Sequence, residues 1–155
     1  MTLVRPDDTT VIRDTRLQGL YRYWLDKLDR RAMPARADID PIEMKAWLGN
    51  LLLVEFPEDR MQYRIRLDGV NIVQFYGNTR QGKGVEVMTA DEERRIVLPQ
   101  YFTVLDHKLP AYYEARFQTS EGIPTVQYKL LLPLSDDGVR VNMVLGGLYF
   151  DQQRY

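Results

Sequence analysis

The stretch "TVQYKLLLPLSDDGVRVNMVLGGLYF", residues 125–150, decides the fold that the sequence predicts. Two long runs of aliphatic, β-branched and aromatic residues flank "SDDG", residues 135–138, and such a cluster of Asp and Gly is typical of a tight turn. A third run of the same kind, "AYYEARF" at residues 111–117, precedes them and is joined to them through "SEGI". These segments predict an antiparallel meander of three strands.

A predicted β-hairpin precedes the meander. Residues 51–56 form an apolar run, "PEDR" follows as a turn, and residues 61–67 then alternate between apolar and polar side chains. The alternation predicts one buried and one exposed face for the second strand. The apolar face consists of Met61, Tyr63, Ile65 and Leu67.

Helices are predicted between the hairpin and the meander. Residues 70–76 form a short amphipathic segment, and a glycine-rich loop follows at residues 77–84. Thr89 and the glutamate three residues later form a capping box, which predicts the start of a long helix that ends near His107. Pro99 lies inside this segment, so a kink is expected there.

An amphipathic helix is predicted near the N-terminus, after a flexible arm at residues 1–13. Its cap is Asp14 or Thr15, and its apolar residues recur at helical spacing. Four of them follow coiled-coil spacing, so a homodimer built on residues 14–31 is expected. The alternative is that the whole stripe packs within its own domain, as amphipathic surface helices normally do. The predicted interface consists of Leu17, Tyr21, Trp24 and Leu28.

The connector "RRAMPARADIDP", residues 30–41, combines a helix stop with a helix start. Its first proline cannot continue the N-terminal helix. Asp40 is a good N-cap, and Pro41 suits the first position of a short helix over residues 41–48. Arg36 is placed to bond free helix-end carbonyls or a carboxylate, which would hold the connector in place.

The order of elements indicates an α+β fold: a five-stranded antiparallel sheet with helices on one face and an N-terminal helix. The segments "LYRYWLDKLDRRAMPARADIDP", "YRIRLDGVNIVQFYGNTRQGKGVEV", "KLPAYYEARF" and "YKLLLPLSDDGVRVNMVLGGL" carry a family resemblance. The chain resembles PAS domains, and in particular the single-domain alphaproteobacterial PAS family of unknown function. The resemblance implies one PAS-like domain over residues 14–155, with two strands before and three strands after a helical crossover.

The composition narrows the functional classes. The chain has 155 residues, of which 45% are apolar, as in an ordinary soluble domain. Lys and Arg number 21 against 22 Asp and Glu, which argues against nucleic acid as a partner. Because no apolar run approaches the roughly 20 residues of a membrane span and no apolar signal segment is present, a cytoplasmic protein without a membrane partner is expected.

Residue types also restrict the cofactors. The chain has no cysteine, which excludes the cysteine-linked flavin adduct and the thioester chromophore of some PAS proteins. His107 is the only histidine and is expected at a helix end, so haem ligation and a histidine-rich metal site are not expected. "GNTRQGKG", residues 77–84, is close to a phosphate-binding loop but lacks the final Ser or Thr and follows a helix. No cofactor and no metal are predicted.

Candidates for a binding site come from aromatic and basic residues. Aromatic side chains between sheet and helices could line a ligand pocket, although they more often belong to the core. Arg64 and Arg66 project from one strand face and are expected to form salt bridges, with anion binding as the alternative, and Arg36 belongs to the same class. The pocket candidates are Tyr63, Phe75, Tyr101, Tyr113, Tyr128 and Asn142.

The sequence favours a sensory or signalling module that binds a small ligand or a partner protein and acts through another chain. The partner is expected to be an unidentified signalling protein. Two alternatives stay open: a small enzyme of isomerase-like cone fold, and an assembly domain without a ligand. An enzyme would need an acid–base pair in a cavity, and spacing alone reveals no convincing pair, so no catalytic residue is predicted.

Replacement of Asp40 tests the predicted cap. Asp40→Ala is expected to lower the free energy of unfolding by about 1 kcal/mol, because the side-chain bond to the following backbone is lost. Chemical unfolding measures the change. Unfolding curves that coincide with those of the wild type would show that the cap assignment is wrong.

Overall fold

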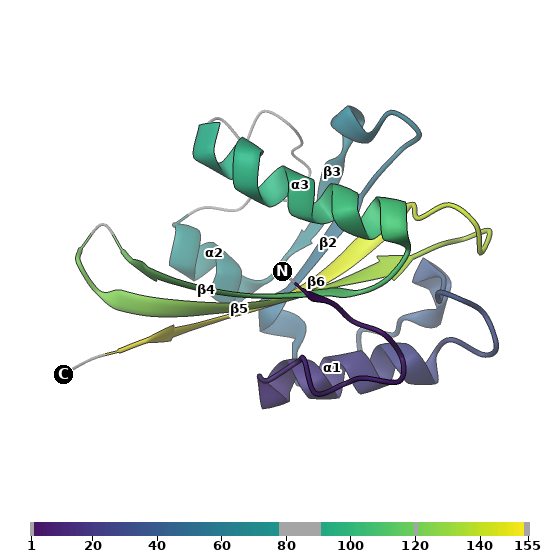
Figure 1. Cartoon of the computed structure of the whole chain (residues 1–155), viewed down its shortest axis with the longest axis horizontal. Coiled ribbons are helices and arrows are strands. Elements are labelled where there is room, and N and C mark those ends of the chain that lie inside the picture. The colour runs from purple at the N-terminus through teal and green to yellow at the C-terminus, as the bar shows by residue number, and fades with distance from the viewer. Residues whose placement is uncertain (1, 78–90, 120, 154–155) are drawn as a thin grey trace.

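The computed structural model describes residues 2–77, 91–119 and 121–153. The strands are β1 Thr2–Leu3, β2 Leu51–Glu55, β3 Arg64–Asp68, β4 Ala111–Gln118, β5 Pro124–Leu134 and β6 Met143–Gln152. The helices are α1 Thr15–Asp26, α2 Val70–Tyr76 and α3 Asp91–His107. The strands form one sheet, with α1 against one face and α2 and α3 over the opposite face (Figure 1).

The α+β class and the antiparallel sheet are confirmed. β2 and β3 form the predicted hairpin, and β4, β5 and β6 form the predicted meander. β6 joins the two groups, because it pairs with β5 on one side and with β2 on the other. The sheet has six strands rather than five, in the order β1-β4-β5-β6-β2-β3, because β1 pairs with the outer edge of β4.

The N-terminal segment differs from the flexible arm that the sequence predicted for residues 1–13. β1 pairs with β4, and the amide of Val4 donates to the carbonyl of Pro110 at 2.8 Å. Val4 and Ile12 are fully buried in the hydrophobic core. A few apolar residues in a polar stretch are enough to dock this segment, although they produce no periodic signal in the sequence.

Helix α1 begins where the sequence predicted, with Asp14 as its cap. The Asp14 carboxylate accepts a hydrogen bond from the amide of Leu17 at 3.1 Å. The helix lies very close to β6 at Gly147, where a Cβ would come within 2.7 Å of Leu17 and 2.8 Å of Leu20. An added methyl would require the buried side chains of Leu17 and Leu20 to move.

The predicted dimer interface on this helix is wrong, because its side chains pack within the chain. Leu17, Tyr21 and Trp24 are between 0% and 3% exposed. The indole N–H of Trp24 donates to the backbone carbonyl of Pro133 in β5 at 3.0 Å. Leu28 follows the helix and is half-buried. The stripe therefore packs on the protein's own sheet, and association of two copies through another surface stays a prediction.

Helices α2 and α3 match the predicted segments. α2 ends at Gly77, whose φ of 89° is the left-handed conformation that favours glycine. α3 contains Pro99, and the hydroxyl of Thr103 donates to the carbonyl of Pro99 at 2.9 Å. The predicted capping residue Thr89 and the glycine-rich loop beyond Gly77 lie outside the described residues.

The connector contains no α-helix at residues 41–48, and turns occupy most of this segment instead. A helix of this length is unstable in isolation and needs a buried face. Met44 is the one residue of the segment that is buried, so packing does not support a helix. Asp40 still accepts a hydrogen bond from the amide of Ile42 at 2.9 Å, which keeps the capping interaction at the start of the turns.

The first half of the connector is held by its polar residues. Arg36 donates to the carbonyl of Ile39 at 3.1 Å, as expected for a side chain that bonds a free carbonyl. Asp38 accepts from the amide of Ala35 at 2.7 Å and pairs with Arg31 at 2.8 Å. These bonds connect the end of the first helical region to the turns that follow.

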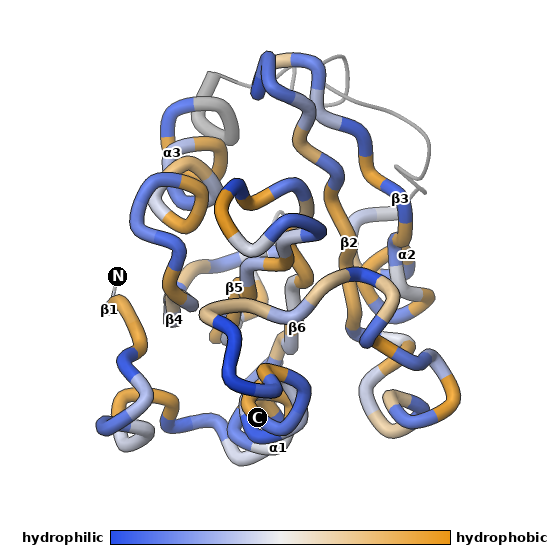
Figure 2. The backbone as a smooth tube through the Cα atoms, turned by 90° about the vertical axis from the view of Figure 1, so that its right-hand side faces the viewer, coloured by the Kyte–Doolittle hydropathy of each residue, from blue (hydrophilic) through white to orange (hydrophobic). Residues whose placement is uncertain are grey.

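Strand β3 begins later than predicted. A 3-10 turn at Arg60–Gln62 precedes it, and the Asp59 carboxylate accepts from the amide of Met61 at 3.1 Å. Met61 is 41% exposed, whereas Tyr63 and Ile65 are buried as predicted. Figure 2 shows hydrophilic and hydrophobic residues alternating along β3, beside the more uniformly hydrophobic β2.

The close approach of α1 to β6 makes a pair of glycine substitutions informative. Gly147→Ala is expected to lower the free energy of unfolding by about 1–3 kcal/mol, because the new methyl overlaps Leu17 and Leu20 in a packed core. Gly146→Ala is the matched control, since a Cβ there lies 3.3 Å from its nearest neighbour, Leu131, and should cost less. Chemical denaturation measures both variants. Equal losses would show that α1 does not limit the space at this position.

Candidate ligand cavity between the sheet and helices α2 and α3

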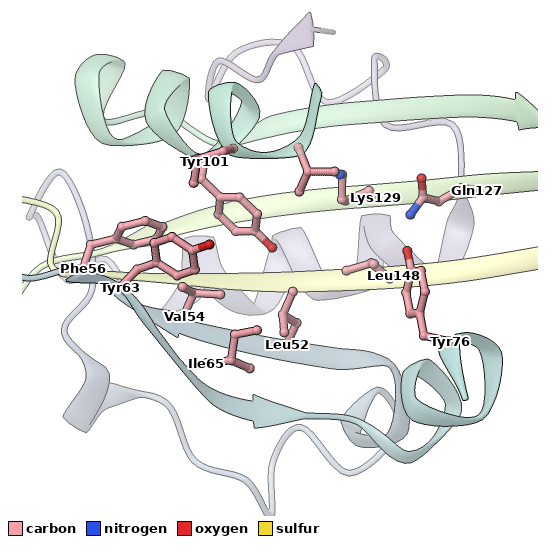
Figure 3. Close-up of a pocket in the computed structure, with 12 residues that line it drawn as sticks. Leu52, Val54, Phe56, Tyr63, Ile65, Tyr76, Tyr101, Gln127, Lys129 and Leu148 are labelled. Carbon is pink, nitrogen blue, oxygen red and sulfur yellow. The ribbon is translucent and has the colours of Figure 1, made fainter. Parts of the chain in front are cut away.

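A cavity of about 130 Å³ lies between the sheet and helices α2 and α3. Figure 3 shows side chains converging on it from the central strands and from both helices. Most of its walls are aliphatic or aromatic, and the polar groups are those of tyrosine, glutamine and lysine side chains. The described lining residues are Leu52, Val54, Phe56, Tyr63, Ile65, Tyr76, Val97, Leu98, Tyr101, Gln127, Lys129 and Leu148.

Strand alternation explains which residues face this cavity. Gln127 and Lys129 of β5 point into it, two positions apart, and Leu52 and Val54 of β2 do the same. Both strands are paired on each side, β5 with β4 and β6, and β2 with β3 and β6. The sheet therefore fixes the direction of these side chains.

Aromatic rings close one end of the cavity. The ring centre of Phe56 lies 5.8 Å from those of both Tyr63 and Tyr101. Figure 3 shows the hydroxyl groups of Tyr63 and Tyr101 directed toward the middle of the cavity. At the other end, Tyr76 of α2 stands opposite Gln127 of β5 (Figure 3). Polar groups thus enter the cavity from both ends.

Lys129 is a charged residue in this mainly apolar lining, and it is only 4% exposed. Its ammonium donates to the side-chain amide oxygen of Gln100 on α3. The same nitrogen lies 5.3 Å from the ring centre of Tyr113 on β4. Burying an ammonium costs free energy that hydrogen bonds and an electron-rich ring face partly offset. These contacts hold a positive charge at the wall of the cavity.

Two of the six predicted pocket residues line the cavity, namely Tyr63 and Tyr101. Tyr113 lies next to it on the same face of the sheet, where its hydroxyl is 3.4 Å from the carbonyl of Gln100. Tyr128 belongs to the opposite face, with its ring centre 5.8 Å from the guanidinium of Arg16. The prediction for Tyr128 is therefore wrong, because neighbouring residues of a strand point to opposite faces.

The remaining two candidates, Phe75 and Asn142, form contacts outside the cavity. Phe75 stacks on Phe150 with ring centres 3.7 Å apart and an angle of 6° between the rings, which attaches α2 to β6. Asn142 accepts from the amide of Asp136 at 2.9 Å and donates to its carboxylate at 3.0 Å. Asn142 thus closes the turn between β5 and β6 rather than contacting a ligand.

The arginine candidates also form structural contacts. Arg66 pairs with Glu55 across the hairpin at 2.9 Å, so the salt-bridge interpretation is confirmed for this residue. Arg64 donates to the carbonyl of Tyr63 at 3.0 Å. Arg36, Arg64 and Arg66 are not among the described residues that line the cavity. The cavity therefore gives no support for the alternative that these arginines bind an anionic ligand.

His107 and the metal-binding residue types stay apart from the cavity. His107 is exposed at the C-terminal end of α3, as the sequence predicted, and is not among the lining residues described. Within residues 2–77, 91–119 and 121–153, no cluster of three or more His, Cys, Asp or Glu residues is arranged to hold a metal ion. The helices described in those same ranges include none that is long and apolar enough to span a bilayer.

Sequence reasoning missed several polar lining residues, of which Lys129 is the most informative. Lys129 directly precedes the apolar run "LLL" in a strand predicted to be central. A charged residue at an inward position of such a strand is rarely buried, and that rarity is the signal that could have identified it. Gln127 carries the same signal more weakly, and Tyr76 at the end of a short helix carries none.

The fold and the cavity can now be compared with known proteins. A family profile described as "PAS domain" matches residues 12–149. The chain belongs to the PAS domain family. Among curated proteins, no match was found. The finer expectation, that this PAS domain belongs to the single-domain alphaproteobacterial group, stays a prediction.

Solved structures similar to this PAS domain are distant in sequence. A light-oxygen-voltage (LOV) domain studied with a flavin analogue is 12% identical, with a TM-score of 0.51 over 71% of this chain and 82% of that chain. The LOV protein of Rhodobacter sphaeroides is 14% identical, with a TM-score of 0.47 over 72% and 68%. The PAS domain of the fruit-fly ELK potassium channel is 17% identical, with a TM-score of 0.48 over 72% and 94%. At these identities the likeness concerns the fold alone.

The phenol of Tyr113 gives the cavity region a measurable pH dependence. Burial raises the pKa of Tyr113 to about 12. The unfolded chain ionises near the ordinary value of about 10, so the stabilising contribution of the neutral phenol is complete below that pH and is lost as the pH rises toward 12. Tyr113→Phe should therefore lose less free energy of unfolding than the wild type between pH values of about 9 and 11. Equal losses in urea titrations at the two pH values would contradict this assignment.

Proposed function

We propose that this PAS domain is a sensory or signalling module that binds a small molecule in the cavity and transmits the change to another protein. The observation that carries the proposal is the cavity itself, whose apolar walls contain a few directed polar groups. Small-molecule sites in proteins combine these two properties. Membership in the PAS family supports the same interpretation, because PAS domains are typically sensory modules rather than enzymes.

The volume of the cavity limits the size of the ligand. An engineered cavity of about 150 Å³ binds benzene, and the cavity here measures about 130 Å³. A flavin has three fused rings and a haem is larger still, so the space between the described residues favours a smaller ligand than either. The chain also lacks the cysteine that a flavin photoadduct requires. We therefore expect a ligand of about one ring or a short chain.

A ligand in this position would contact the sheet and two helices at once. The strands form one wall, Tyr76 belongs to α2, and Val97 and Tyr101 belong to α3. A ligand shifts a conformational equilibrium only if it interacts differently with the two states. Contacts with both helices and with the sheet would change if a helix moved over the sheet, which is how a ligand could favour one state.

Several expectations accompany this proposal without support from a specific contact. They are an unidentified signalling protein as partner, a homodimer and a cytoplasmic location. An assembly domain without a ligand is the alternative that the following experiment separates from the proposal. No catalytic role is proposed for the lining residues.

Filling the cavity tests ligand binding. Val97→Trp places a larger side chain at the half-buried wall on α3 and is expected to abolish ligand retention. Native mass spectrometry of protein purified under non-denaturing conditions compares the wild type with the variant. Val139→Trp is the matched control, because Val139 is 65% exposed and does not line this cavity, and it should retain the ligand.

Two results would count against ligand binding. One is a wild-type protein that carries no small molecule and shows no thermal stabilisation by ring-sized compounds. The other is a ligand that remains bound in Val97→Trp as well as in Val139→Trp. The first result would favour the assembly domain, and the second would place the ligand at another site.

A further inference from the structure

We propose that Lys129 makes the cavity selective for anionic ligands, such as a carboxylate attached to one ring or to a short aliphatic chain. This inference rests on the proposed function, because it names the ligand class of the same cavity. It is carried by the placement of a buried ammonium in an otherwise mainly apolar lining.

The position of Lys129 is fixed at both ends of its side chain. Its backbone lies in β5 between Tyr113 of β4 and Leu148 of β6, its partners across the two neighbouring strands. Its ammonium is bonded to the side chain of Gln100 on α3. Figure 3 shows the side chain between the aromatic end of the cavity and Gln127. The charge is therefore held in place before any ligand enters.

A charge in this environment discriminates strongly between ligands. Coulomb interactions weaken in proportion to the local dielectric constant, so an ammonium in an apolar wall attracts an anion more strongly than an ammonium in water does. Folding has already removed most of the water around Lys129, which is 4% exposed. A neutral ligand of the same shape gains only ordinary hydrogen bonds, which are weaker than those that join charged groups.

The neighbouring groups suit the same class of ligand. Gln127 lies two residues before Lys129 on the same strand face, and the hydroxyl groups of Tyr63 and Tyr101 point toward the cavity. Amide and hydroxyl groups are able to donate to carboxylate oxygens. The lining residues that the structure describes include no Asp or Glu that would repel an anion. The aliphatic walls at Leu52 and Leu148 would accept the apolar part of the ligand.

Two pairs of probes of equal shape test the selectivity: butyrate with butyramide, and benzoate with benzamide. Each pair differs in charge and shares its apolar part. Isothermal titration calorimetry on the wild type near neutral pH measures the four affinities. The anion of at least one pair is expected to bind about tenfold more tightly than its amide, as a hydrogen bond between charged groups predicts.

Substitutions at Lys129 assign the selectivity to this residue. Lys129→Met keeps the apolar stem and removes the charge, so the anion should lose about tenfold in affinity while the amide is unaffected. Lys129→Arg retains a positive charge and should keep the preference for the anion. Circular dichroism of each variant verifies that the fold is intact.

The possible failures are distinguishable. Equal binding of anion and amide by the wild type would overturn the anion selectivity and leave the proposed ligand cavity intact. A preference for the anion that survives in Lys129→Met would overturn the role of Lys129. If neither the probes nor other ring-sized compounds bind, the proposed function fails together with this inference.

Discussion

The packing of α1 on the sheet depends on the absence of a side chain at Gly147 in β6. β6 connects the hairpin to the meander, and Gly146 and Gly147 face its opposite sides. A Cβ at Gly147 would overlap Leu17 and Leu20 of α1, whereas one at Gly146 would approach Leu131 on the other face. Glycine weakens the interior of a strand. The two glycines therefore reduce the intrinsic stability of β6, and Gly147 allows α1 to pack closely on one face.

The two faces of the sheet differ in the space that they leave for a ligand. On the α1 side, Leu17, Tyr21 and Trp24 are buried, so these apolar residues of the helix pack within the chain. The side covered by α2 and α3 retains a cavity and the buried ammonium of Lys129. An apolar residue of similar size usually gives a more stable interior than a buried charge. The proposed recognition of an anionic ligand offers a functional reason for a lysine at this position.

Local signals predicted the sheet because turn chemistry and strand patterns agree with the final packing in the stretch at residues 125–150. They failed where long-range contacts decide the structure. β1 consists of two residues that take their partners from β4, and residues 41–47 carry a helix cap without the burial that a helix requires. The spacing of apolar residues in α1 is the same for a coiled coil and for packing on a sheet. In the site, the predicted Tyr128 and the observed Lys129 are neighbours in β5, so their side chains face opposite sides of the sheet and only Lys129 lines the cavity.

The effect of a ligand is expected at the N-terminal half of α3, because the other elements around the cavity are held more firmly. Gly69 caps the start of α2 at a position where a Cβ would come within 2.4 Å of the Gly49 carbonyl oxygen. The other end of α2 is attached to β6 by the stacked rings of Phe75 and Phe150. The C-terminal end of α3 is connected to the hairpin by the ion pair of Asp106 with Arg60 at 2.6 Å. Its described N-terminal part is less uniformly buried: Ile96 is 52% exposed and Val97 lines the cavity while half-buried, whereas Leu98 is buried. Segments with few buried contacts open at the lowest free energy. The proposed ligand would contact this part of α3, so we expect it to change the packing where the described part of the helix is least buried.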